Sequence, residues 1–226
     1  MAVETEPAIE TLDHSRARLQ PAARTKSDVP LLLLTVVAAL SSIAALLLHA
    51  VGWVRMPFTI SLVSLPGMVL LVCITMWARH QGRQLLLNRI AVGAVAGLVG
   101  LVVYDVVRLV VEEALPIHFD AFISLPIFGS LMTGQPVASA IALAAGWGYH
   151  ISNGLTFAIV YSLIAGPARW WWGLVWGFTL ELGMMVVYPA VVRPKSLSGF
   201  VVVSVIGHAF FGATVGLLTE RKAMPS

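Results

Sequence analysis

The chain has 226 residues, of which 58% are hydrophobic and only 11% charged, and its mean hydropathy is +0.89. Soluble domains carry about 25% charged residues, so this composition excludes an ordinary soluble domain and predicts the lipid bilayer as the main partner. The net charge of +3 does not indicate nucleic acid, because the basic residues lie in short segments between apolar runs. The single cysteine, Cys73, excludes a disulfide framework and a cysteine metal site.

The N-terminal part of the chain predicts a tail followed by a membrane span. Residues 1–29 are polar and of mixed charge, which predicts a disordered cytoplasmic tail. The next apolar run, Pro30 to Val54, exceeds the roughly 7 to 15 residues of a signal-peptide core, and no small-x-small cleavage pattern ends it. It therefore predicts a first transmembrane helix.

Five further runs reach the roughly 20 apolar residues that a bilayer core of about 30 Å requires. Together they predict an all-α, polytopic helix bundle of about six spans, forming one transmembrane domain over residues 30–219, with a short tail over 220–226. The five runs are Phe58 to Ala78, Ile90 to Val111, Val137 to Ala165, Trp170 to Val192 and Gly199 to Thr219.

The distribution of lysine and arginine predicts that both termini lie in the cytoplasm. With this orientation the outside keeps Arg55, Arg193 and Lys195, with Arg108 near the outer end of the third run. The tryptophans at 170–172, at the start of the fifth run, fit an interfacial aromatic belt. The inside collects the remaining basic residues, which are Arg16, Arg18, Arg24, Lys26, Arg79, Arg83, Arg89, Arg169, Arg221 and Lys222.

One long connection, residues 114–136, joins the third and fourth runs. It is apolar for a loop, contains His118 and Asp120, and is interrupted by two prolines and a glycine. Irregular backbone at membrane depth is tolerated only when it is buried in protein or lines a cavity. The segment therefore predicts a lid over the outer side of the bundle, interfacial or re-entrant; a loop lying on the headgroups fits equally well.

Polar side chains inside the apolar runs are candidate functional residues, because a charged group at mid-helix costs roughly 2.5 to 3.5 kcal/mol on insertion scales. At about 1.5 Å of rise per residue, His208 lies about 14 Å and Glu181 about 17 Å into the membrane. Helical spacing puts each polar group on a stripe with small residues. These groups are either hydrogen-bonded helix contacts or a polar site that binds a proton or ligand, and we predict the site from His150, Asn153, Glu181, His208, Asp105 and Arg108.

A weak internal repeat groups the same residues. Gly97 precedes Asp105 by the interval that separates Gly173 from Glu181, and His-x-x-x-Gly occurs at 150/154 and 208/212. The pattern predicts two parallel repeats, each of one outward and one returning helix. Gly-x-x-x-Gly spacings at 93/97, 173/177 and 212/216 indicate close helix packing.

A second pattern runs through residues 147–218. It consists of His150-x6-Phe157-Ala158-x2-Tyr161, Pro167, Trp172-Gly173 with Gly177, Tyr188-Pro189 and Gly207-His208. In these residues the C-terminal half resembles the YagU-type family of small, uncharacterised bacterial inner-membrane proteins. The resemblance implies a bacterial plasma membrane and paired helices with a histidine in each returning helix, and it implies no mechanism.

Three functions fit these observations. The first is a permease or channel for a proton, metal ion or small polar solute, with Glu181 binding the cargo and His150 and His208 as ligands or relay. The second is a membrane-embedded enzyme acting on a lipid or quinone-like substrate, with a metal ion on His150, His208 and Glu181, or a haem between the two histidines. The third is a non-catalytic subunit or assembly factor, whose glycine faces bind partner helices in a homo-oligomer or membrane complex. No catalytic residue is assigned.

Overall fold

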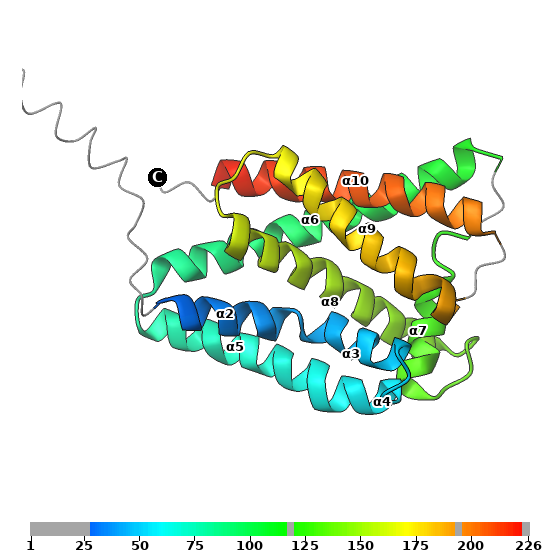
Figure 1. Cartoon of the computed structure of the whole chain (residues 1–226), viewed down its shortest axis with the longest axis horizontal. Coiled ribbons are helices and arrows are strands. Elements are labelled where there is room, and N and C mark those ends of the chain that lie inside the picture. Colours follow the sequence, from blue (N-terminus) through cyan, green and yellow to red (C-terminus); the bar gives the residue numbers. More distant parts are fainter. Residues whose placement is uncertain (1–27, 117–119, 193–195, 223–226) are drawn as a thin grey trace, which may run out of the picture.

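The computed structural model describes residues 28–116, 120–192 and 196–222, and every element in them is a helix. The helices pack side by side into one bundle, and consecutive long segments run in opposite directions along it (Figure 1). Both ends of the described chain lie at the same end of the bundle (Figure 1). Most of the predicted cytoplasmic tail, along with His118, Arg193 and Lys195, lies outside the described residues.

The first predicted span is not one straight helix. It consists of α2 (Asp28–Ala39) and α3 (Ser41–Ala50), which are bent by 52° relative to each other. Two serines at the bend bond to other helices: the Ser41 hydroxyl donates to the Ser64 carbonyl at 3.4 Å, and the Ser42 hydroxyl donates to Asn153 Oδ1 at 2.7 Å. Sharp bends are common at such small polar pairs. The single helix predicted over 30–54 is therefore wrong.

The second span is continuous but irregular. It consists of α4 (Met56–Thr59), a π-helical turn, η1 (Ile60–Ser64), and α5 (Leu65–His80). Pro66 is the second residue of α5, one residue after the π-helical turn, and a π-helical turn accommodates a residue that lacks a backbone N–H. Gly67 then lies against Ser41, where an added Cβ would overlap the serine side chain.

A helix is present at each of the last four predicted spans, with small changes at its ends. α8 begins with a capped turn, since the Ile141 N–H donates to the Ser139 hydroxyl, and it ends at Gly166, whose φ of 58° favours glycine. The last helix continues to Lys222, into the predicted tail. The four helices are α6 (Gln84–Ala114), α8 (Ala140–Ala165), α9 (Trp171–Val192) and α10 (Leu197–Lys222).

Glycines join these helices into two pairs, α6 with α8 and α9 with α10. A Cβ on Gly97 would lie 2.8 Å from the carbonyl oxygen of Gly154, and a Cβ on Gly173 would overlap the carbonyl of Gly212. Gly97 and Gly173 occupy corresponding positions of the internal repeat, as do Gly154 and Gly212. The two helix pairs therefore cross with the same register.

The apolar connection over 114–136 contains a short helix, α7 (Ser124–Thr133), that packs on α8. The approach is close at two glycines: a Cβ on Gly129 would overlap the carbonyl of Ala142, and one on Gly146 would overlap the carbonyl of Leu125. The chain before α7 is held by Glu112, whose Oε2 accepts from the Ala121 N–H at 3.0 Å. Whether α7 enters the membrane stays a prediction.

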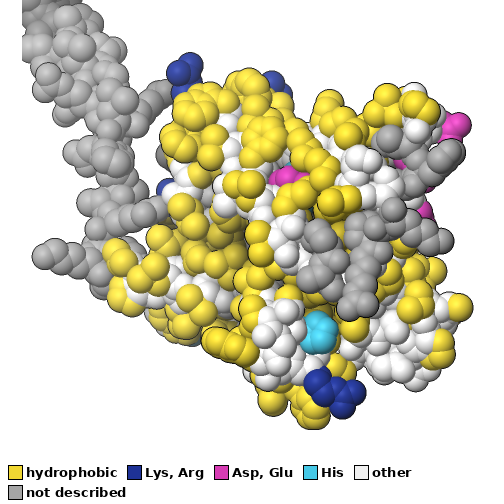
Figure 2. All heavy atoms as spheres, turned by 45° about the vertical axis from the view of Figure 1, so that its right-hand side comes forward, with side chains coloured by type: hydrophobic (Ala, Val, Ile, Leu, Met, Phe, Trp, Pro, Cys, Tyr) yellow, Lys and Arg dark blue, Asp and Glu magenta, His cyan; other side chains and the backbone are white. Residues whose placement is uncertain are grey.

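Among the described residues, three helices are long and apolar enough to cross a membrane, namely Met56–His80, Gln84–Ala114 and Leu197–Arg221, and the bent pair Val29–Ala39 with Ser41–Ala50 makes a fourth if it is one span. α8 is long enough, but His150 and Asn153 lower its hydropathy. Figure 2 shows a face covered mainly by hydrophobic side chains, with lysine and arginine near its edges. The chain is thus an all-helical protein of the membrane type.

Candidate functional site

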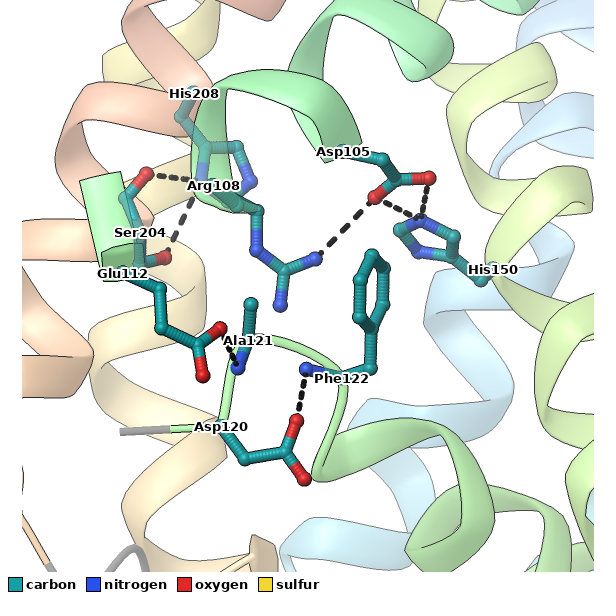
Figure 3. Close-up of polar contacts among 9 residues, drawn as sticks. All are labelled: Asp105, Arg108, Glu112, Asp120, Ala121, Phe122, His150, Ser204 and His208. Atoms are coloured by element: carbon teal, nitrogen blue, oxygen red, sulfur yellow. Dashed lines mark hydrogen bonds and ion pairs between the residues drawn. The ribbon is translucent and has the colours of Figure 1, made fainter. Parts of the chain in front are cut away.

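The first acid–base pair, which is partly buried, joins α6 to α8. His150 Nε2 lies 3.0 Å from Asp105 Oδ1 and 3.2 Å from Oδ2 (Figure 3). Arg108, almost one helical turn further along α6, places Nη1 3.4 Å from the same Oδ1. The Asp105 carboxylate is therefore shared between an imidazole and a guanidinium, and the Arg108 residue is only 5% exposed.

The second pair joins α9 to α10. His208 Nδ1 lies 2.7 Å from Glu181 Oε2, and the Ser204 hydroxyl donates to the same oxygen at 2.6 Å. His208 Nδ1 also lies 3.0 Å from the Ser204 carbonyl oxygen (Figure 3). Because the Glu181 carboxylate and the Ser204 carbonyl oxygen are both acceptors, we assign a proton to Nδ1, which makes Nε2 the acceptor nitrogen of the neutral imidazole.

The two pairs occupy corresponding places in the repeat. Asp105 and Glu181 each follow the glycine that packs against the partner helix, and His150 and His208 each precede one. Each carboxylate contacts the histidine of its own helix pair. Helix pairs that cross with the same register place equivalent side chains in contact. The common register therefore explains why each carboxylate of the repeat contacts the histidine of its own helix pair.

Tyr104 lies between the two pairs. Its ring centroid is 4.9 Å from that of His208 and 5.9 Å from that of His150. The Arg108 guanidinium lies 4.7 Å from the Tyr104 ring and 5.2 Å from the Phe122 ring, a distance typical of cation–π contacts. Tyr104 is not among the site residues predicted from the sequence, although its i, i+4 spacing to Arg108 was a signal for it.

Both histidines, Tyr104 and Arg108 line one cavity of about 90 Å³, which has room for several water molecules. The rest of the lining is mostly apolar or aromatic and comes from α3, α6, α7, α8, α9 and α10. Helix α7 contributes Phe128 and Leu125, so the predicted lid segment forms part of the cavity wall. This arrangement can hold water or a small ligand against both histidines.

Asn153 lines the same cavity but serves a structural contact as well. Its Oδ1 accepts from Ser42, and the Tyr149 hydroxyl donates to the Ser42 carbonyl at 3.2 Å. Both contacts hold the bend between α2 and α3 against α8. Of the predicted site residues, Asp105, Arg108 and His150 thus form one group, Glu181 and His208 form another, and Asn153 lies beside them.

The metal set predicted from His150, His208 and Glu181 is not assembled. His150 contacts Asp105 instead, and within residues 28–116, 120–192 and 196–222 no three His, Cys, Asp or Glu side chains form a group that could hold a metal ion. A haem between the two histidines does not fit either, because the Tyr104 ring packs against both imidazoles. The depth of a residue in the membrane can be counted along its helix. The rotation of that helix about its own axis, which decides the partner of each side chain, cannot be counted in this way.

The fold and the site together define a helical protein of the membrane type, with one buried and one partly buried carboxylate–histidine pair beside one cavity. The chain belongs to a family of unknown function, DUF6789, which matches residues 87–225. This match includes α6, which the resemblance over 147–218 does not reach, and it covers both helix pairs. No curated protein and no solved structure matches the chain.

Proposed function

We propose that the chain crosses a bacterial plasma membrane six times, with both termini in the cytoplasm and α7 as a lid on the outer side. The alternating directions of the long segments support this topology (Figure 1). The exposure of Arg79, Arg83 and Arg169 supports it as well, because these residues lie at the end of α5, just before α6 and between α8 and α9, which are helix ends on the side of the bundle where both chain ends lie. The resemblance to the YagU type supports the choice of membrane.

We further propose that this protein is a permease or channel for a proton or small cation. The observation that carries the proposal is the presence of two carboxylate–histidine pairs, one buried and one partly buried, whose histidines line the same cavity. Ionisable groups inside membrane helices are expensive and mark ion or proton pathways. Histidine exchanges a proton more readily near neutral pH than any other side chain.

The charges of the site suit a singly charged cargo. With both carboxylates ionised and both histidines neutral, Asp105, Glu181 and Arg108 leave the cluster with one net negative charge. A buried net charge is unfavourable unless it is compensated, and one proton or one monovalent cation would compensate it. Glu112 lies at the outer edge of the site, where it bonds to the Ala121 N–H.

Flux measurements in proteoliposomes test this function. With an imposed membrane potential and an internal pH dye, we expect proton flux above that of empty liposomes. Glu181→Gln and His208→Gln should reduce the flux to the empty level, because each removes a titrating member of a buried pair. Glu113→Gln, which changes an exposed carboxylate on α6, should retain the wild-type flux.

Two results would contradict the transport function. One is an unchanged flux in correctly folded Glu181→Gln and His208→Gln proteins. The other is a wild-type flux that does not exceed that of empty liposomes for protons, sodium or potassium. Asp105→Asn and His150→Gln, in the other pair, provide an independent test if the first variants fold poorly.

A membrane-embedded enzyme is the second candidate, and the predominantly apolar wall of the cavity favours it. Phe128 and Phe157, together with the cation of Arg108, suit a lipid or quinone-like molecule with a polar group. In this function a histidine–carboxylate pair would act as general acid and base. Mass spectrometry of organic extracts from the purified protein would detect a retained quinone or lipid.

The structure weakens the argument for a subunit or assembly factor. That function rested on glycine faces free to bind partner helices. In the bundle, Gly93 and Gly97 contact α8, and Gly173 and Gly177 contact α10, so these faces are already covered by the chain's own helices.

A further inference from the structure

A second pocket lies away from the carboxylate–histidine pairs. It is a groove between the last part of α8 and the first part of α9, with a volume of about 290 Å³, and it shares no lining residue with the central cavity. Tyr161 and Trp176 form part of its wall, with ring centroids 6.3 Å apart. Its rim is apolar and open, since Ile164 is 60% exposed and Trp172 is 48% exposed.

Two polar atoms in the wall of this groove lack an acceptor. The Tyr161 hydroxyl and the Trp176 indole N–H are buried, and neither has a hydrogen-bond partner in the part of the chain that the structure describes. The Tyr161 residue is only 3% exposed. Buried tyrosine and tryptophan normally find partners, and each unsatisfied group costs about 1–3 kcal/mol. Two such groups in one groove indicate that a bound molecule supplies the acceptor.

The surroundings of the groove indicate which molecule this is. The rim faces outward from the bundle, where apolar side chains such as Ile164 and Val175 are exposed and lipid is the expected solvent. The groove lies next to the tryptophans at 170–172, which suit the depth of the interface. Arg169 is exposed and directly follows Ala168, a lining residue, so a cation is available at the same level.

We propose that this groove binds one phospholipid molecule. An acyl chain fills the apolar part between α8 and α9. The Tyr161 hydroxyl and the Trp176 indole N–H are covered in this structure, and when lipid enters the groove both side chains turn to donate to an ester or phosphate oxygen. The Arg169 side chain interacts with the headgroup phosphate. This proposal does not depend on the transport function, because the groove and the central cavity are lined by different residues.

The experiment compares thermal stability in two environments. Tyr161→Phe removes only a hydroxyl, so in a phospholipid-free maltoside micelle the variant should have a melting temperature equal to or above that of the wild type. In nanodiscs of phosphatidylethanolamine and phosphatidylglycerol its melting temperature should be lower, because the bond to lipid is lost. Tyr149→Phe is the matched control: its hydroxyl donates to the Ser42 carbonyl, so its loss should lower the melting temperature in both environments.

Native mass spectrometry provides the second measurement. We expect wild-type protein and Trp171→Phe, which lies outside the groove, to retain a phospholipid, and the double variant Tyr161→Phe with Trp176→Phe to lose it. Arg169→Gln should reduce the preference for phosphatidylglycerol if the phosphate is bound there. The proposal is overturned if Tyr161→Phe behaves alike in micelles and nanodiscs, or if the double variant retains as much phospholipid as the wild type.

Discussion

At the scale of single residues, hydrogen bonds and ion pairs stabilise two carboxylates inside the helix bundle. Glu181 is 3% exposed, and it remains in the bundle because the Ser204 hydroxyl and His208 Nδ1 both contact one of its oxygens. Asp105 is stabilised in a different way, by Arg108 and His150 together. The two pairs are equivalent in the repeat but differ in charge, since only the first contains an arginine.

Removing one member of a buried pair should be costly. His208→Leu leaves Glu181 without its imidazole, and we expect the free energy of unfolding to fall by about 3–5 kcal/mol, with part of this loss recovered in the double variant with Glu181→Leu. Equilibrium unfolding in mixed micelles measures the coupling. Across the pairs, combining His150→Leu with His208→Leu should show weaker coupling, and strong coupling there would contradict the separate pairing.

At the scale of helices, glycine determines where the bundle is tightly packed. The pairs α6 with α8 and α9 with α10 approach so closely that side chains larger than hydrogen are excluded at the crossings. Helix α7 uses the same device against α8 at Gly129 and Gly146. These contacts place the histidines relative to the carboxylates, so the chemistry of the site depends on residues that do not touch it.

Alanine substitutions distinguish glycines at helix–helix contacts from glycines that have open space beside them. Gly173→Ala and Gly212→Ala insert a methyl group into opposing backbone, and each should lower the free energy of unfolding by about 1–3 kcal/mol. Gly148→Ala and Gly183→Ala are the controls: no atom lies within 4 Å of the added Cβ, so they should be neutral or raise the stability by up to about 1 kcal/mol. The same unfolding assay distinguishes the two groups, and equal effects in both would argue against the glycine contacts.

At the scale of the whole molecule, the proposed topology places the two ends of the bundle in different compartments. Gln81 lies in the turn before α6 and Gln135 lies in the turn after α7, and both are exposed. A single crossing by α6 separates them. The end with both described chain ends would face the cytoplasm, and the end with α7 would face outward (Figure 1).

Cysteine labelling in intact cells tests this topology. After Cys73→Ala removes the exposed native thiol, Gln135→Cys should react with a membrane-impermeant maleimide in intact cells, and Gln81→Cys should react only after the cells are permeabilised. The Cys73→Ala protein, which has no cysteine left, shows the background labelling. Reaction of both positions from the same side would contradict a crossing by α6.

The sequence by itself determined the helical class, the approximate ends of the long helices and the polar residues inside them. A helix that crosses a lipid bilayer must be long enough and apolar enough to span its hydrocarbon core. Both properties can be counted within one segment of the sequence. Spacing along the chain also indicated the repeat at Gly97 and Gly173. Such features depend on one segment at a time or on intervals between residues.

Only the tertiary structure decided which polar residues meet. Glu181 and His208 were predicted at similar depth and do pair, but His150 faces Asp105, and Tyr104 separates the two pairs. The rotation of each helix about its axis and the register of each crossing come from glycine contacts between segments far apart in the chain. The bend at Ser41 likewise depends on its neighbour Ser64 from another helix. The depth of a residue along its helix can be counted from the order of residues. The direction in which its side chain points is set by the helices packed around it.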